Sequence, residues 1–242
     1  MRVLLLGGTA EGRALAKALH PNVEVISALA GRVRDTALPV GAVRVGGFGS
    51  VPGLRGWLHA EHIDAVVDAT HPFAATMTAH VAEACRQLRL SHLVLVRPAW
   101  DPGAAEVVRS DVEAAQAVAT QKYRRVFLTT GRSGVKALAA SDAWFLIRAV
   151  TDPASLPRHH QVLLSRGPYD YDDELALMRD HRVDALVTKN SGGDITRGKL
   201  EAAATLGIPV VMVARPPLPD GVSTVGTVAE AADWVARLAN LR

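Results

Sequence analysis

The feature that most constrains the fold of this chain is an apolar run near the N-terminus that breaks into small residues. Residues 3–6 read Val-Leu-Leu-Leu, and residues 7–13 continue as Gly-Gly-Thr-Ala-Glu-Gly-Arg. This order predicts a buried strand, a tight glycine turn and the start of a helix, whose free N–H groups can bind an anion. The glycines do not have the GxGxxG spacing, so an ordinary strand–helix turn is the alternative. The turn predicts a phosphorylated ligand and does not indicate what is done with it.

The composition is that of an ordinary globular protein. Of its 242 residues 49% are hydrophobic, enough for one large α/β domain or two small ones. No stretch resembles a secretory leader or a membrane span, so we expect a cytoplasmic protein without membrane contact. The net charge of +3 is spread along the chain, which argues against nucleic-acid binding. The single cysteine, Cys85, excludes a disulfide framework and is expected to fill the core.

Apolar runs alternate with amphipathic stretches at the spacing of strand–helix units. This alternation predicts an α/β fold with two Rossmann-like domains, each a parallel sheet flanked by helices, and an active site in the cleft between them. The expected strands are 2–7, 23–28, 42–46, 64–69, 92–96, 125–130, 144–148, 161–165, 184–188 and 209–213. The expected helices are 11–19, 51–60, 73–89, 111–120, 133–140, 171–181, 197–206 and 227–239.

Residues 97–103 contain two prolines and a glycine and follow neither the strand nor the helix pattern of apolar residues. We interpret this segment as a linker. We therefore expect one domain over residues 1–97 and a second over residues 98–242. In open parallel sheets, ligands bind beyond the carboxyl ends of the strands. The segments that carry the chemistry all follow predicted strands, so each domain should present them at that edge.

The end of the second predicted strand indicates which cofactor the first domain binds. An NAD site usually has a carboxylate there for the ribose 2′-hydroxyl. Residues 27–34 have none, and instead contain Arg32 and Arg34, which favours a 2′-phosphate and hence NADPH. The alternative is that both arginines are solvated loop charges.

Two further strand ends contribute to the predicted NADPH site. Three glycines in residues 46–49 suggest that the backbone passes close to the adenosine or to the second domain, and residues 68–73 end the strand where a nicotinamide ring would lie. His71 is a candidate catalytic residue that could hydrogen-bond the nicotinamide or donate a proton, although a structural role in capping or packing explains it equally well. The expected cofactor-binding residues are Gly7, Gly8, Thr9, Ala10, Glu11, Gly12, Arg13, Gly31, Arg32, Arg34, Gly46, Gly47, Phe48, Gly49, Thr70, His71 and Pro72.

Several other chemistries are disfavoured. No Tyr-x-x-x-Lys occurs, which argues against a short-chain dehydrogenase, and no Gly-x-Ser-x-Gly nucleophile elbow occurs. The nearest metal-like pair, His59 and His62, lacks a partner carboxylate arrangement, so we expect no metal.

The second domain repeats the strand–glycine–helix pattern with an arginine at the turn. Residues 129–134 read Thr-Thr-Gly-Arg-Ser-Gly, and cations stand at or near other predicted strand ends. Arginine outnumbers lysine by 22 to 5, which suits recognition of carboxylates or phosphates but is also what a GC-rich genome produces. The convergence of these cations predicts an acidic ligand with several negative groups.

The densest polar segment, residues 188–196, joins a predicted strand to a predicted helix. Lysine, asparagine, serine and paired glycines there are typical of a loop that holds an anion, and a plain hydrophilic connection is the alternative. Lys189 is the second candidate catalytic residue. The expected substrate-binding residues are Thr130, Gly131, Arg132, Ser133, Arg148, Arg166, Lys189, Asn190, Ser191, Gly192, Gly193, Thr196 and Lys199.

Taken together, these segments resemble the precorrin-6A reductase family nearly end to end. The motifs are Gly7-Gly8-Thr9-Ala10-Glu11-Gly12, Ala30-Gly31-Arg32, Gly46-Gly47-Phe48-Gly49, Asp68-Ala69-Thr70-His71-Pro72-Phe73-Ala74, Thr129-Thr130-Gly131-Arg132, Arg166-Gly167-Pro168, Lys189-Asn190-Ser191-Gly192-Gly193 and Leu206-Gly207-Ile208-Pro209-Val210-Val211-Met212. The resemblance implies NADPH-dependent hydride transfer to the macrocycle of precorrin-6A, giving precorrin-6B in cobalamin biosynthesis. It implies a tetrapyrrole substrate with many carboxylates and transient contact with neighbouring pathway enzymes.

Three alternatives stay open at this point. The substrate could be the cobalt-containing precursor of the anaerobic branch. The protein could be a non-catalytic NADP(H) sensor whose second domain contacts a partner. A methyltransferase that uses S-adenosylmethionine also has a glycine-rich first turn, but the expected acidic residue after the second strand is missing.

Overall fold

The structure, a computed structural model, describes residues 1–29, 31 and 38–241. The predicted cofactor residues Arg32 and Arg34 lie outside the described residues. The described chain forms two compact units, one of residues 1–97 with 216–242 and the other of residues 98–215.

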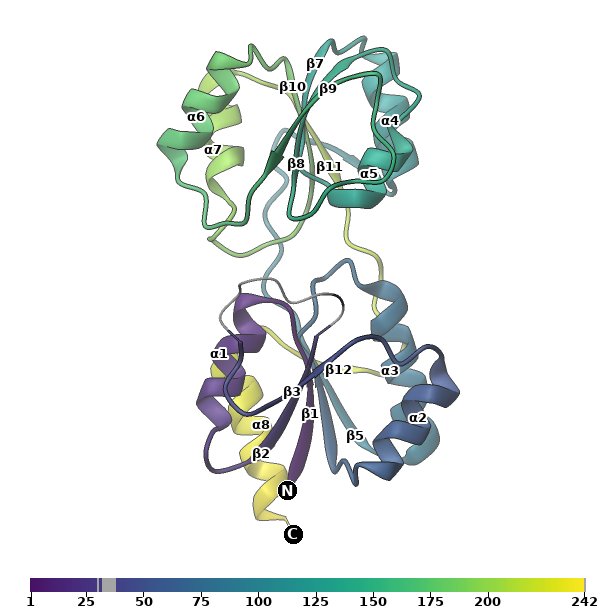
Figure 1. Cartoon of the computed structure of the whole chain (residues 1–242). Coiled ribbons are helices and arrows are strands. Elements are labelled where there is room, and N and C mark those ends of the chain that lie inside the picture. The colour runs from purple at the N-terminus through teal and green to yellow at the C-terminus, as the bar shows by residue number, and fades with distance from the viewer. Residues whose placement is uncertain (30, 32–37, 242) are drawn as a thin grey trace. The chain divides into compact units, whose positions relative to one another are not determined.

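The first unit is a six-stranded parallel sheet with helices on both faces. Its strands are β1 (Arg2–Leu6), β2 (Glu24–Leu29), β3 (Ala42–Val45), β4 (Ala65–Asp68), β5 (Ser91–Leu95) and β12 (Ser223–Val225), in the order β12-β5-β4-β1-β2-β3. The helices α1 (Ala10–Leu19) and α8 (Val228–Asn240) cover one face, and α2 (Val51–Ala60) and α3 (Ala75–Leu88) cover the other (Figure 1).

Strand alternation explains the two cores of this unit. Val3 and Leu5 pack in a cluster with residues of α1 and α8, whereas Leu4 and Leu6 pack in a second cluster with residues of α2 and α3. Both sides of β1 are therefore apolar, as a strand buried on both faces requires. Cys85 is buried in the second cluster, which confirms its predicted role as core filling.

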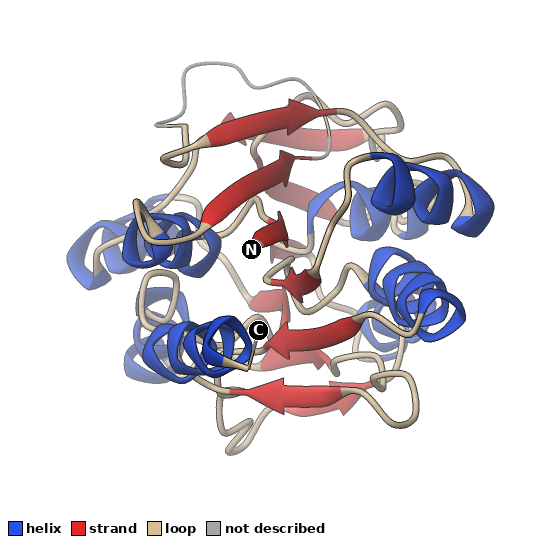
Figure 2. Ribbon diagram, turned by 90° about the horizontal axis from the view of Figure 1, so that it is seen from below, coloured by secondary structure: helices blue, strands red, loops and turns tan. Residues whose placement is uncertain are grey.

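The second unit repeats this architecture. Its strands are β6 (Glu106–Val108), β7 (Arg125–Leu128), β8 (Trp144–Ala149), β9 (His159–Leu164), β10 (Ala185–Lys189) and β11 (Val210–Val213), in the parallel order β6-β11-β10-β7-β8-β9. The helices α4 (Asp111–Thr120) and α5 (Gly131–Ala137) lie on one side, and α6 (Tyr171–Asp180) and α7 (Gly198–Leu206) lie on the other. Figure 2 shows the same layering, with strands in red between helices in blue. The predicted α/β fold with two parallel sheets is confirmed.

The predicted extent of the second domain is corrected at its C-terminal end. Residues 216–242 were expected to belong to it, but they complete the first unit. Here β12 pairs in parallel with β5, and Ala231 and Val235 of α8 lie in the same core cluster as Leu15 of α1. The second unit correspondingly receives its edge strand from β6, which pairs with β11. Neither three-residue strand was predicted.

In each sheet the strands that follow the first one in the chain add on one side of it, and the later strands add on the other side. The strand order therefore changes direction between β1 and β4 in the first unit and between β7 and β10 in the second. Parallel pairing brings the carboxyl ends of such neighbours to one edge, and this switch point is where ligands bind in open α/β sheets.

Among the described helices, none combines the length and apolar character that a bilayer span requires.

Candidate functional site

The turn after β1 has the open backbone that the sequence predicts. Gly7 N–H donates to the carbonyl of Ala28 at 3.0 Å, which ties the turn to β2. Gly8 has a φ of +107°, and no heavy atom lies within 4 Å of the position that a Cβ would occupy. This conformation favours glycine, and it leaves room directly in front of the turn. The turn therefore fits the phosphate groups of a dinucleotide.

The hydroxyl of Thr9 holds two strand-end loops together. It caps α1 by accepting a hydrogen bond from Gly12 N–H at 3.0 Å, and it donates to the carbonyl of Ala69 after β4 at 2.7 Å. An added Cβ on Gly12 would lie 3.2 Å from the Cα of Gly7, so glycine is needed for close packing here. Thr9 and Gly12 thus shape the turn, and the Thr9 hydroxyl already has both its partners in the protein.

Other predicted cofactor residues of this unit are placed as follows. The Glu11 carboxylate pairs with Arg97 at 2.9 Å, so it is held by the protein instead of facing a ligand alone. Gly31 is exposed with a φ of +101°. Pro72 lies in the turn that precedes α3, not in the first turn of that helix. Ala10 and Arg13 lie in the first turn of α1 and are partly buried.

The glycine loop after β3 is held by an arginine that the sequence analysis missed. Arg44 donates from Nη1 to the carbonyl of Gly46 at 2.5 Å and from Nη2 to that of Gly47 at 3.0 Å, and its guanidinium lies 4.0 Å from the ring centre of Phe48. Gly46 and Gly49 have φ values of +113° and +75°. An arginine two residues before paired glycines is the sequence signal for this arrangement.

The loop after β4 is organised by a buried carboxylate. Asp68 accepts hydrogen bonds from Thr70 N–H at 3.0 Å and from the Thr78 hydroxyl at 2.7 Å. His71 is exposed, and its Nδ1 accepts a hydrogen bond from Phe73 N–H at 3.3 Å. In the neutral ring the proton is therefore on Nε2, which makes that nitrogen a hydrogen-bond donor.

Burial is the main cause of the pKa shifts of Cys85 and His92, two groups that lie near Asp68. Burial raises the pKa of the Cys85 thiol to about 12, and the negative charge of Asp68 adds to this effect. Burial lowers the pKa of His92, against the opposing effect of Asp68. A thiol held in its protonated form is a poor nucleophile, which agrees with the placement of Cys85 in the core.

In the second unit the structure brings three predicted residues together at the ends of β7 and β10. The ammonium of Lys189 donates to the hydroxyl of Ser133 at 2.7 Å and lies 3.4 Å from Oδ2 of Asp111, a carboxylate that the sequence analysis did not include. Thr130 is buried beside them, and an added Cβ on Gly134 would lie 1.8 Å from its Oγ1. The cluster is packed tightly enough to fix the Lys189 side chain.

Arg148 is largely enclosed by other residues of its own unit. Its Nη2 is 2.5 Å from Oε1 of Glu174, and the two side chains are only 10% and 1% exposed. The guanidinium also lies 3.9 Å from the ring centre of Tyr169 and 4.8 Å from that of Phe127. This placement argues against the predicted substrate contact, because the charge is neutralised inside the unit.

Lys199 is likewise an internal residue. It is 5% exposed, donates to the carbonyl of Thr196 and lies 4.6 Å from the ring centre of Trp100. Arg132 and Arg166, by contrast, are exposed at the strand ends. Of the predicted substrate cations, these two are exposed, whereas the Lys189 side chain is only 14% exposed and is paired with Asp111.

The polar loop after β10 is tied to other segments of its own unit. Asn190, Ser191 and Gly193 hydrogen-bond to Trp100 or Arg215, neither of which was predicted to matter. The φ value of Gly131, +71°, and those of Gly192 and Gly193, +66° and +72°, belong to the region that favours glycine. No group of three or more metal-ligating side chains occurs in the described parts of the chain.

The comparisons with known proteins now decide the family. The model of the family described as "Precorrin-6x reductase CbiJ/CobK" matches residues 2–236. The chain belongs to this family. It is 68% identical over 239 residues to a precorrin-6A reductase of Mycobacterium tuberculosis, covering 98% of each chain, and 52% identical over 243 residues to that of Rhodococcus erythropolis, again covering 98% of each. A solved structure titled "CobK precorrin-6A reductase" matches with a TM-score of 0.90 at 32% identity, covering 98% of this chain and 97% of that one.

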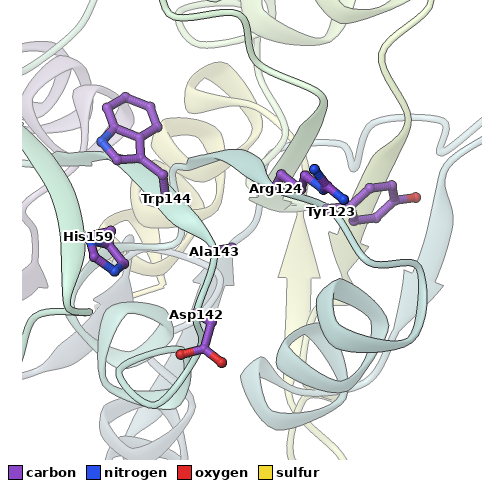
Figure 3. Close-up of a pocket in the computed structure, with 6 residues that line it drawn as sticks. All are labelled: Tyr123, Arg124, Asp142, Ala143, Trp144 and His159. Atoms are coloured by element: carbon purple, nitrogen blue, oxygen red, sulfur yellow. The ribbon is translucent and has the colours of Figure 1, made fainter.

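This CbiJ/CobK family member also has a cavity in its second unit, at the amino ends of the strands. Its volume is about 400 Å³, and it is lined by residues that precede or begin β7, β8 and β9 (Figure 3). These are Tyr123, Arg124, Asp142, Ala143, Trp144 and His159. Because it lies at the amino ends of the strands, it is separate from the strand-end cluster around Lys189.

Proposed function

We propose that this protein catalyses the NADPH-dependent reduction of precorrin-6A to precorrin-6B in cobalamin biosynthesis. The observation that carries the proposal is the match of both units, over 98% of the chain, to enzymes named precorrin-6A reductase at 68% and 52% identity. Relatives named cobalt-precorrin-6A reductase are 30%, 28% and 25% identical, so the metal-free tetrapyrrole is favoured as the substrate.

The first unit would bind the cofactor. The open space at Gly8 and the capped start of α1 suit the pyrophosphate, since backbone N–H groups there can approach an anion. The His71 Nε2–H lies in the loop after β4, where the Rossmann pattern places the nicotinamide. Arg32 and Arg34 would bind the 2′-phosphate, a role proposed from the sequence alone.

The second unit would bind the acidic substrate. Arg132, Arg166 and Lys189 are the predicted cations that suit contact with acetate and propionate carboxylates. Asp111 and Ser133 hold the Lys189 ammonium in one place, so the charge is oriented before the substrate arrives.

The reaction adds a hydride and a proton across one double bond of the macrocycle. Bound NADPH supplies the hydride and is oxidised to NADP⁺. The residues of the chain would orient the two reactants and deliver the proton, for which the Lys189 ammonium and His71 in its imidazolium form are the candidates.

The test is to mix the purified protein with NADPH and precorrin-6A and to follow cofactor oxidation together with the pigment spectrum. We expect one NADPH to be oxidised for each precorrin-6B formed. Binding of NADPH without oxidation would contradict the proposal and favour a sensor. For cofactor choice, Arg32→Ala should weaken NADPH binding much more than NADH binding, and an equal loss for both would refute the 2′-phosphate role.

A further inference from the structure

We propose that Arg215 and Trp100 are positioning residues for substrate binding, because they fix the loop of residues 190–193 that follows β10. All of these residues belong to the second unit. The inference rests on the proposed function, in which Lys189, the last residue of β10, contacts a substrate carboxylate.

Arg215 holds the loop through its carbonyl groups. Its Nε donates to the carbonyl of Asn190 at 2.8 Å, and its Nη2 donates to those of Ser191 at 3.1 Å and Pro98 at 3.2 Å. A planar guanidinium fixes the directions of several acceptors at once, which the single ammonium of a lysine cannot do. Arg215 therefore joins the loop to the first residue of its unit.

Trp100 holds the same loop from a second direction. Its indole Nε1–H donates to the carbonyl of Gly193 at 2.7 Å. Its backbone N–H and carbonyl both pair with the side-chain amide of Asn190, each at 2.9 Å. Three of the four loop residues thus have an external hydrogen-bond partner.

Gly192 shows how closely the loop and Arg215 are packed. It has a φ of +66°, and an added Cβ would lie 2.1 Å from the carbonyl oxygen of Pro98 and 2.2 Å from Nη2 of Arg215. Only glycine fits this position, so the loop conformation and the position of the guanidinium depend on each other.

The conformation of this loop affects the position of Lys189 because the two are joined by a backbone hydrogen bond. Ser191 N–H donates to the carbonyl of Lys189 at 2.7 Å, so the turn begins at the residue whose ammonium contacts Ser133 and Asp111. A displacement of about 1 Å at a binding group can cost two orders of magnitude in rate. Loosening the turn should therefore weaken substrate binding and leave the cofactor site in the other unit unchanged.

The experiment compares two variants with two matched controls. Arg215→Lys keeps the positive charge but loses the planar guanidinium with its several N–H donors. Trp100→Phe loses the indole N–H but keeps an aromatic ring beside Lys199. Arg125→Lys and Trp144→Phe are the controls, because Arg125 Nε donates to the carbonyl of His181 at 2.6 Å and stacks on Trp144, away from the loop. We measure KM for precorrin-6A, Kd for NADPH, and deuterium exchange of residues 189–194.

We expect KM to rise about tenfold in Arg215→Lys and by a smaller factor in Trp100→Phe, with unchanged NADPH affinity, faster exchange in the loop, and no change of KM in either control. Faster exchange with an unchanged KM would overturn the positioning role, as would an equal rise in the controls. If Arg215→Lys does not fold, Trp100→Phe decides alone. A wild-type protein that does not oxidise NADPH with precorrin-6A would reject the proposed function, and the substrate role with it, before any variant is compared.

Discussion

The two units differ in the residues that lie at the carboxyl ends of their central strands. At the ends of β1 and β4, glycine backbone and the Thr9 hydroxyl shape the edge. At the ends of β7 and β10 glycine turns recur, but the cation predicted to bind a ligand there, Lys189, is paired with Asp111 of α4. A glycine turn can thus be interpreted directly from a sequence, whereas a cation must first be checked for an internal partner.

Arg148 and Glu174 show this most clearly. Both side chains are buried, and Nε and Nη1 of Arg148 and Oε2 of Glu174 have no hydrogen-bond partner within the described structure. Such a pair costs desolvation energy, and removing one partner leaves an uncompensated buried charge. The pair therefore belongs to the scaffold of the second unit.

The largest effect we expect comes from breaking this pair. Glu174→Ala should lower the free energy of unfolding by about 3–5 kcal/mol, measured by urea denaturation. The matched control is Glu201→Ala, which removes an ion pair of 3.1 Å with Arg197 whose side chains are 52% and 58% exposed. That control should cost no more than about 1 kcal/mol. Equal losses in the two variants would remove the distinction between internal and surface pairs.

The glycine edge of the first unit is tested by Gly8→Ala. The new Cβ would enter the open space in front of the turn, so we expect Kd for NADPH to rise about tenfold, and the positive φ should also cost about 1–2 kcal/mol of stability. Gly56→Ala in α2 is the control, because nothing lies within 4 Å of its Cβ position and its φ is ordinary. It should keep NADPH affinity and gain up to about 1 kcal/mol of stability. Unchanged NADPH affinity in Gly8→Ala would exclude this turn from the cofactor site.

The smallest effect concerns pH. Burial lowers the pKa of His92 in the folded state, so the unfolded chain binds more protons below its own pKa of about 6.5. The stabilising contribution of the neutral ring is thus complete above that pH and is lost as the pH falls toward the folded-state pKa. His92→Gln should flatten this part of the stability profile. Profiles that remain parallel for wild type and His92→Gln would contradict this account.

Much of the fold could be predicted because most helices and strands carry their own periodic signal. The glycine turn after β1, five of the six strands of each sheet and the helices between them were all predicted in type. The three-residue strands β6 and β12 were not, since their pairing with β11 and β5 is decided by distant segments. For the same reason the return of residues 216–242 to the first unit has no local sequence signal.

The sequence predicted which polar residues stand near strand ends, but not the partners of their side chains. Arg148 and Lys199 were interpreted as ligand groups because they stand near strand ends, yet Glu174 and Trp100 bind them from other elements. Arg215 was missed because its three carbonyl partners leave no motif in the sequence.

In the proposed reaction, a hydride passes from NADPH to the tetrapyrrole on this protein. The most direct measurement uses NADPH carrying deuterium at C4, prepared as each diastereomer separately, with precorrin-6A as acceptor and mass spectrometry of the product. The account predicts that one diastereomer transfers one deuterium into precorrin-6B and the other none. If neither diastereomer transferred deuterium to the product, the claim would be contradicted.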